Sequence, residues 1–175
     1  MLITPEYREM NTALHNNQSY GSRVRKQVYA DVMKLIAEVE AESVLDYGCG
    51  KGEMSRHVPC VVNYDPAVDG FSAKPRACDI VACCDVLEHI EPDLLDNVLS
   101  HIQELARKAI YLVISTRPAG KILSDGRNAH LIVKPAKWWE DKIRVTFTDW
   151  SIKSVDANKP GEVTLILLGA NDGSR

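Results

Sequence analysis

Residues 44–55, VLDYGCGKGEMS, change from an apolar run into a loop with a glycine at every second position. The three glycines are Gly48, Gly50 and Gly52. Glycine lets a backbone turn sharply and approach a ligand without a Cβ in the way. The apolar run carries Asp46 near its end, and it predicts a short buried strand over residues 43–47. A carboxylate at the end of a buried strand, followed by bare backbone, predicts a ligand-binding loop.

Two kinds of phosphate-binding loop are alternatives for this stretch, and its residues disfavour both. A dinucleotide loop has the pattern G-x-G-x-x-G, which places a pyrophosphate against a helix N-terminus. Here Glu53 occupies the position of the third glycine, and a carboxylate repels a pyrophosphate. A nicotinamide-dependent (NAD) oxidoreductase is therefore the weaker alternative. A Walker loop does not fit, because Lys51 precedes the last glycine and no G-K-[ST] sequence occurs.

The same residues suit a ligand that lacks phosphate and carries a cationic ammonium group. Asp46 can accept hydrogen bonds from such a group or pair with its charge. Asp65 closes the next apolar run, 15 positions after Gly50, where its carboxylate can bind both hydroxyls of a ribose. Asp65 also has a structural alternative, because an Asp that precedes Pro66 commonly forms a turn.

Apolar periodicity along the chain predicts an alternation of helices and strands. Helices are expected over residues 5–18, 23–42, 92–108 and 135–142, with a further helix beginning near Glu53. Strands are expected over residues 43–47, 60–64, 79–84, 109–115, 144–149 and 163–168. This alternation predicts an α/β fold with a doubly wound sheet, in which ligands bind beyond the carboxyl ends of the strands.

Length and composition indicate a single globular domain over residues 1–175. No run approaches the roughly 20 apolar residues of a membrane span, and the N-terminus lacks the apolar core of a signal peptide. The cysteines are odd in number and form no C-x-x-C pair, which predicts reduced thiols in a cytoplasmic protein. Cys83 and Cys84 are interpreted as buried structural cysteines, with a catalytic nucleophile as the alternative.

The formal net charge of −3 is unevenly distributed. Residues 1–105 hold 9 basic and 17 acidic side chains, whereas residues 106–175 hold 12 basic and 7 acidic ones. The overall charge gives no indication of nucleic-acid binding. A positive face in the C-terminal part would favour an anionic substrate, and an ordinary solvated surface is the alternative.

The sequence VLDYGCGKG, followed by VNYD and then by DIVACCDVLEHIEP, resembles the class I S-adenosylmethionine-dependent methyltransferases. The resemblance covers residues 43–115 and implies a Rossmann-like, mostly parallel sheet with an antiparallel C-terminal strand. It also implies S-adenosylmethionine as the cofactor, with Asp65 binding its ribose. The residues placed at the cofactor are Asp46, Tyr47, Gly48, Cys49, Gly50, Gly52, Asp65, Pro66, Asp85 and Val86.

The chain would then divide into four parts with different tasks. These are N-terminal helices or a lid (1–42), a cofactor-binding core (43–115), a substrate-side loop and helix (116–143) and C-terminal strands (144–175). Tyr20 and Gly21 form either part of the lid or a joint between two helices. Residues 125–130 are predicted as a substrate-binding loop, with a turn formed by Asp125, Gly126 and Asn128 as the alternative. For Trp138 and Trp139 the alternatives are a cover for the site, or one buried and one exposed side chain.

The segment after the second strand departs from the family pattern. Only residues 66–78 separate Asp65 from Asp79, whereas a parallel crossover alone needs about a dozen residues. We therefore predict that an edge strand and its helix are missing or reduced to a loop. The residues that contact adenine normally come from this region, and here Phe71 and Ser72 are the candidates.

The sequence DVLEH lacks the Asn/Asp-Pro-Pro-aromatic motif of DNA amino-methyltransferases, which disfavours methylation of DNA bases. It resembles family members that act on small metabolites or hydroxyl groups. In ubiquinone-pathway O-methyltransferases and small-RNA 3′-end 2′-O-methyltransferases, a similar E-x-x-E-H and a later His hold a divalent ion. The residues that match this pattern are Asp85, Glu88, His89 and His130, with Asp in place of the first Glu.

Three roles are open for these residues. A bound divalent ion, Mg²⁺ or Mn²⁺, would hold oxygens of the acceptor and lower the pKa of an attacking hydroxyl. Alternatively, His89 or His130 acts as a general base, with Asp85 as a further catalytic candidate. In the third case His89 is a structural residue that caps or packs.

The sequence thus predicts methyl transfer from S-adenosylmethionine to an oxygen or nitrogen of a small or exposed acceptor. An RNA end stays among the acceptors, although the overall charge does not indicate nucleic acid. The alternative of another class is an inactive scaffold that binds the cofactor or a partner protein. The sequence leaves the oligomeric state open.

Overall fold

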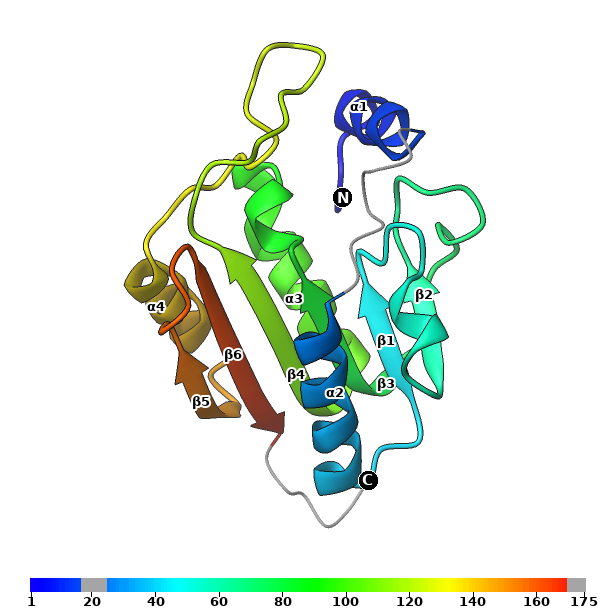
Figure 1. The fold of residues 1–175 in the computed structure, drawn as a ribbon, viewed down its shortest axis with the longest axis vertical. Helices are drawn as coiled ribbons and strands as arrows, with labels where there is room; N and C mark the ends of the chain where they lie inside the picture. Colours follow the sequence, from blue (N-terminus) through cyan, green and yellow to red (C-terminus); the bar gives the residue numbers. More distant parts are fainter. Residues whose placement is uncertain (17–24, 170–175) are drawn as a thin grey trace.

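The structure, a computed structural model, describes residues 1–16 and 25–169. These residues form a six-stranded sheet with the order β2-β1-β3-β4-β6-β5 (Figure 1). The strands are β1 Val44–Tyr47, β2 Val61–Tyr64, β3 Cys78–Cys84, β4 Ala106–Ser115, β5 Trp150–Asp156 and β6 Glu162–Gly169. Strands β1 to β4 run parallel, whereas β6 is antiparallel to both β4 and β5. The predicted Rossmann-like sheet with an antiparallel C-terminal strand is confirmed.

Helices cover both faces of this sheet (Figure 1). The helices that pack on the sheet are α2 Lys26–Val39, α3 Leu95–Leu105 and α4 Ala136–Thr146, whereas α1 Pro5–His15 lies beyond the carboxyl ends of the parallel strands. On one face, Val32 and Leu35 of α2 share a buried cluster with Val44. On the other face, Leu99 of α3 belongs to a second cluster with Leu45. Neighbouring residues of β1 therefore point to opposite faces, as expected for a strand buried on both sides.

The helix α3 follows the predicted apolar spacing, and its inward face is buried. The residues on this face are Leu95, Val98, Leu99, Ile102 and Leu105. A 3₁₀ turn, Pro92–Leu94, precedes the helix. The predicted helix end at Lys108 is wrong, because Ala106 already pairs with Cys78 in the sheet. Pairing with β3 therefore ends the helix at Leu105, before the end that its sequence pattern predicts.

The strand predicted over residues 144–149 is wrong, because α4 continues to Thr146. Trp139 and Ile143 are both fully buried and lie one helical turn apart, so the helical period continues through this region. Val145, whose β-branched side chain favoured a strand, is 71% exposed on the outer side of the helix. The C-terminal strands consequently begin later than predicted, at β5.

The helix predicted to begin near Glu53 is also wrong. After the glycine loop the chain makes only a 3₁₀ turn, Met54–Arg56, before β2 begins. Met54 and Val58 are buried in the same cluster as α2. These two side chains fill the space beside the sheet that a helix would otherwise cover.

The predicted shortening after β2 is confirmed, and β2 forms an edge of the described sheet. Residues 65–77 contain no helix or strand. Two hydrogen bonds fold this loop on itself, from Asp65 N–H to Phe71 O at 3.0 Å and from Phe71 N–H to Val68 O at 3.1 Å. The sheet thus ends one strand away from the glycine loop that follows β1.

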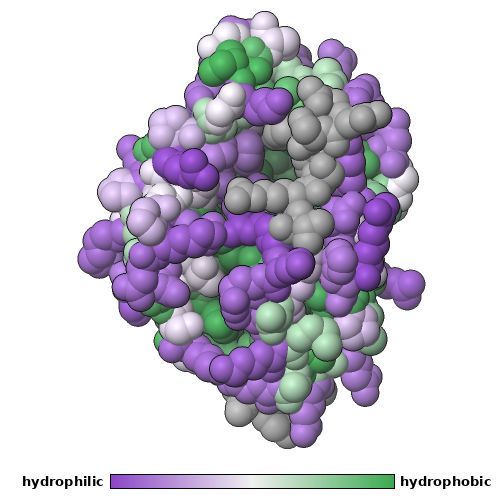
Figure 2. All heavy atoms as spheres, in the orientation of Figure 1, coloured by the Kyte–Doolittle hydropathy of each residue, from purple (hydrophilic) through white to green (hydrophobic). Residues whose placement is uncertain are grey.

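Hydrophilic side chains cover most of the face that carries α2 (Figure 2). Within residues 1–16 and 25–169, no helix combines the length and the apolar character needed to cross a membrane. The lid or joint predicted at Tyr20 and Gly21 lies outside the described residues.

Candidate functional site

A cavity of ≈ 260 Å³ lies at the carboxyl ends of the first three strands, and α1 contributes to its lining. The residues predicted at the cofactor line this cavity, with one exception. Those that line it are Asp46, Tyr47, Gly48, Cys49, Gly50, Asp65, Pro66, Asp85 and Val86. The exception is Gly52, whose backbone faces Asn63 and Phe71. Phe71 and Ser72, the candidates for adenine, do not line the cavity either.

Gly48 leaves no room for a side chain. Its φ of +77° lies in the left-handed region. A Cβ at this position would come within 2.4 Å of the Cγ2 atom of Val86. The Gly48 N–H also donates to the carbonyl of Tyr64 at 2.7 Å, which ties the loop to β2. Only glycine satisfies both the backbone angle and the contact with Val86.

We expect Gly48→Ala to lower the free energy of unfolding by about 2–4 kcal/mol, from left-handed strain and overpacking. The double variant Gly48→Ala/Val86→Ala should recover only the part of the lost stability that comes from overpacking, because the strained φ at position 48 remains. Urea unfolding of both variants and of Val86→Ala measures this. Full recovery in the double variant would contradict the backbone argument.

Two buried carboxylates, Asp46 and Asp65, face the same cavity. The Oδ2 atom of Asp65 accepts from Gly50 N–H at 3.0 Å, and its Oδ1 atom accepts from Ala67 N–H at 2.9 Å. Burial, together with the charge of Asp65, raises the pKa of Asp46 to about 7. The cavity therefore holds unfavourable negative charge that a cationic ligand would offset.

The helix α1 supplies lining residues that the sequence interpretation did not name. They are Tyr7, Asn11 and His15, with Leu2 and Ile3 before the helix. The Tyr7 hydroxyl donates to the carbonyl of His89 at 2.6 Å, and the Thr12 hydroxyl donates to that of Ala67 at 2.8 Å. The spacing of four between Tyr7, Asn11 and His15 places them on one helical face. That spacing was the available signal.

A second cavity, of ≈ 300 Å³, lies beside the first. It is formed by the 3₁₀ turn Leu87–His89, the loop after β4 and the turn between β5 and β6. Asp85 and His89 line both cavities. Glu88 and His130 line the second one only. The two cavities therefore meet at Asp85 and His89.

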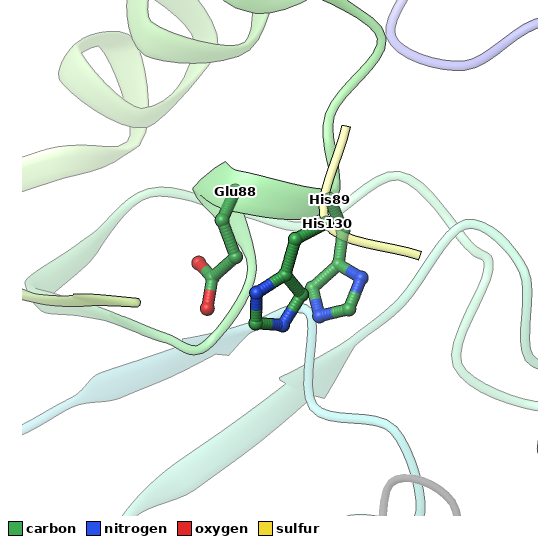
Figure 3. Close-up of side chains that lie close together, drawn as sticks. All are labelled: Glu88, His89 and His130. Atoms are coloured by element: carbon green, nitrogen blue, oxygen red, sulfur yellow. The ribbon is translucent and has the colours of Figure 1, made fainter. Parts of the chain in front are cut away.

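Glu88, His89 and His130 come together at this second cavity (Figure 3). One ligand atom of each lies within 4.8 Å of the others, which is a cluster that could hold a metal ion. Nδ1 of His89 donates to the carbonyl of Ala129 at 2.8 Å, and Nδ1 of His130 donates to that of Arg117 at 2.6 Å. Because a carbonyl only accepts, each neutral ring carries its lone pair on Nε2.

Burial controls the charges of this cluster. Glu88 is fully buried, and its Oε1 accepts from Ser115 N–H at 3.1 Å. Its Oε2 has no hydrogen-bond partner among the described residues. Burial and the nearby Asp85 charge raise the pKa of Glu88 to about 8, while burial and His130 lower that of His89 to about 4. At neutral pH both groups are therefore predominantly uncharged.

Asp85, predicted as a fourth metal ligand, lies outside this cluster. Its carboxylate pairs with the guanidinium of Arg25, which also pairs with Glu162 at 2.6 Å. Asp85 has a φ of +58°, and such a strained backbone in a non-glycine residue commonly marks a functional position. The ion pair with Arg25 joins the start of α2 to both cavities.

Other predicted site residues have structural positions. Trp139 is fully buried in the core, and neither it nor Trp138 lines either cavity, so the predicted cover is wrong. In the 125–130 loop, only Ala129 and His130 line the second cavity. Asn128 orders that loop instead, because its side chain accepts from Ala119 N–H and His130 N–H at 2.9 Å each.

The two cysteines at the end of β3, Cys83 and Cys84, do not supply an activated thiol. Cys83 is fully buried, and Cys84 is partly buried beside the first cavity. Burial raises the pKa of both thiols well above the ordinary value. The nucleophile is the thiolate, so the interpretation of these residues as structural is favoured.

A profile of the methyltransferase domain family matches residues 20–150. The chain belongs to the methyltransferase domain family. Its fold and motifs are those of the class I S-adenosylmethionine-dependent enzymes, as the residues of the glycine loop predicted. Among curated proteins, no sequence match was found.

Solved structures of methyltransferases share the fold of this methyltransferase at low sequence identity. Magnesium protoporphyrin IX methyltransferase from Synechocystis, with bound S-adenosylhomocysteine, has 15% identity and a TM-score of 0.56, covering 94% of this chain and 97% of its own. The 1,6-didemethyltoxoflavin N1-methyltransferase from Burkholderia thailandensis has 14% identity and a TM-score of 0.61, covering 97% and 92%. The small RNA methyltransferase HEN1 has 11% identity and a TM-score of 0.62, covering 91% of this chain but 27% of its own.

Proposed function

We propose that the methyltransferase binds S-adenosylmethionine in the first cavity and methylates an oxygen or nitrogen of an acceptor held in the second. The observation that carries this proposal is that Asp85 and His89 line both cavities. A donor and an acceptor bound in adjoining cavities are held for an in-line reaction without free diffusion. The acceptor is a small molecule or an exposed group, because the second cavity is ≈ 300 Å³ in volume.

The lining of the first cavity fits this cofactor. Asp46 and Asp65 supply buried negative charge, and the Gly48 backbone approaches the cavity without a side chain. Asp46 would pair with the ammonium group and Asp65 with the ribose hydroxyls. Two solved structures of the same fold contain S-adenosylhomocysteine, namely the Synechocystis and Burkholderia enzymes.

The lining of the second cavity fits a divalent cation. Two imidazoles and a carboxylate are a donor set that Mn²⁺ accepts, and the Oε2 atom of Glu88 has no other partner among the described residues. When bound, the ion would lower the pKa of an acceptor hydroxyl. Glu88, His89 and His130 would hold it, and the fixed Nδ1–H bonds would keep both rings oriented.

The chain's own residues contribute alignment more than chemistry. For a hydroxyl acceptor, the oxygen attacks the methyl carbon in line, the carbon–sulfur bond breaks with its electron pair left on sulfur, and the proton passes to solvent. Without a metal, Nε2 of His130, which lines the second cavity, is the candidate general base that would take this proton and pass it to solvent.

We expect His130→Ala to weaken Mn²⁺ binding at least about tenfold while leaving affinity for S-adenosylhomocysteine unchanged, since His130 lines only the second cavity. Electron paramagnetic resonance measures free Mn²⁺, and isothermal titration measures S-adenosylhomocysteine. His57→Ala, at an exposed histidine, is the matched control. Equal Mn²⁺ binding in both variants, or full turnover in EDTA, would rule out the metal role.

The same titration tests the two alternatives from the sequence. Binding of NADH with no binding of S-adenosylhomocysteine would restore the oxidoreductase. Binding of S-adenosylhomocysteine with no turnover on a broad acceptor panel would favour the inactive scaffold.

A further inference from the structure

We propose that the acceptor carries an anionic group, which is a phosphate, phosphonate or carboxylate. Three basic side chains at the mouth of the second cavity, Arg117, Lys121 and Lys159, bind this group. This inference rests on the proposed function, in which the second cavity holds the acceptor. It assigns a chemical class to that acceptor from the side chains around it.

Basic residues from two separate segments line the second cavity. Arg117 and Lys121 come from the loop after β4, and Lys159 comes from the turn before β6. Arg117 and Lys121 form no ion pair with any of the described residues. Two cations on one loop therefore stand at this cavity without an acidic partner in residues 1–16 or 25–169.

The acidic residues of the lining are largely offset within the protein. They are Asp85, Glu88 and Glu162. Arg25 pairs with both Asp85 and Glu162, and Lys159 also pairs with Glu162 at 3.0 Å. The uncompensated charge at the mouth is therefore positive, although the whole chain has a formal charge of −3. A low-dielectric cavity with one sign of charge concentrates ligands of the opposite sign.

The position of Arg117 is set by its surroundings. Its side chain crosses Gly161, where an added Cβ would lie 2.7 Å from Cδ of Arg117. Its carbonyl accepts the Nδ1–H of His130 at 2.6 Å. The backbone of Arg117 is thus tied to the ring of His130. If Arg117 binds the acidic group of the acceptor, a hydroxyl or amine next to that group would lie near the Glu88–His89–His130 cluster. The planar guanidinium suits phosphate and carboxylate oxygens.

Size and charge favour a small acid over a nucleic-acid end. The cavity volume of ≈ 300 Å³ is at the lower end for ligand sites. Residues 1–105, which include the cofactor cavity, hold 17 acidic against 9 basic side chains. This excess of negative charge, like the formal net charge of −3, works against contacts with the phosphates of an RNA strand.

The test is a titration of the full-length protein, loaded with S-adenosylhomocysteine, with inorganic phosphate and separately with acetate. EDTA is present throughout, so that a bound metal cannot attract the anion. We expect wild type to bind at least one of the two anions. The double variant Arg117→Glu/Lys121→Glu should bind that anion at least about tenfold more weakly. Lys34→Glu, at an exposed residue of α2 that lines neither cavity, is the charge-reversal control and should bind as wild type does.

Three outcomes would overturn the inference: no binding of either anion by wild type at tens of millimolar, equal binding by the double variant, or an equal loss in Lys34→Glu. A short single-stranded RNA that binds wild type more than about tenfold tighter than phosphate, and loses this in the double variant, would replace the small acid with an RNA end. Because metal and cofactor are measured separately, failure of the anion leaves the proposed methyl transfer and metal site standing.

Discussion

Asp65→Ala should lower the affinity for S-adenosylhomocysteine about 100-fold, or roughly 3 kcal/mol, because it removes the carboxylate that we propose accepts hydrogen bonds from both ribose hydroxyls. The structure adds a second contribution. Asp65 also accepts the N–H groups of Gly50 and Ala67, which hold the glycine loop against the loop after β2. Isothermal titration at neutral pH measures the affinity.

Two further variants separate the causes of this loss. Asp69→Ala removes an exposed carboxylate from the same loop and should bind as wild type does. Asp65→Asn keeps the volume but places an amide where Gly50 N–H needs an acceptor, so it should also bind weakly. An Asp65→Ala variant that binds within about threefold of wild type would remove Asp65 from the cofactor site.

Asp46→Asn should stabilise the ligand-free protein at pH 8 by about 2–4 kcal/mol while weakening S-adenosylhomocysteine binding. Burial and the charge of Asp65 raise the pKa of Asp46 in the folded protein to about 7, from an ordinary value of 3.8. The folded state therefore holds this proton more tightly than the unfolded chain. Stability is lost as the pH rises from about 4 to about 7, and the loss is complete above that range.

The measurement is urea unfolding of ligand-free protein at several pH values between 4 and 8. Wild type should lose stability across this window, and Asp46→Asn should lose much less. Asp93→Asn, at an exposed carboxylate, should follow the wild-type curve. Parallel curves for wild type and Asp46→Asn would show that Asp46 ionises normally. The buried charge of Asp46 would therefore lower the stability of the ligand-free protein, and the ammonium group of the bound cofactor would offset this cost.

The glycine loop was predictable because its constraints are local. Gly48 needs a left-handed backbone, and Asp46 lies next to the end of a strand whose apolar residues are adjacent in sequence. The missing edge strand was predictable for a similar reason, since the length of residues 66–78 limits what they can form. Chain length and backbone angles are properties that a sequence carries directly.

Element ends and partners depended on contacts between distant segments. The end of α3 is set by pairing of Ala106 with Cys78 in the sheet, and α4 extends because Ile143 is buried in the core. Asp85 matched a metal pattern by spacing, yet it is engaged by Arg25, 60 positions earlier. A local sequence pattern cannot predict an ion pair between residues so far apart in the chain.

By itself, the sequence determined the fold class, the family and the loop that suits the methyl donor, because glycine spacing and strand periodicity act over a few residues. Only the tertiary structure decided which residues share a cavity. It brought α1 to the first cavity and placed Arg117, His130 and Lys159 around the second. Arg117, His130 and Lys159 lie on loops and turns with no periodicity, and they come together only when the chain has folded.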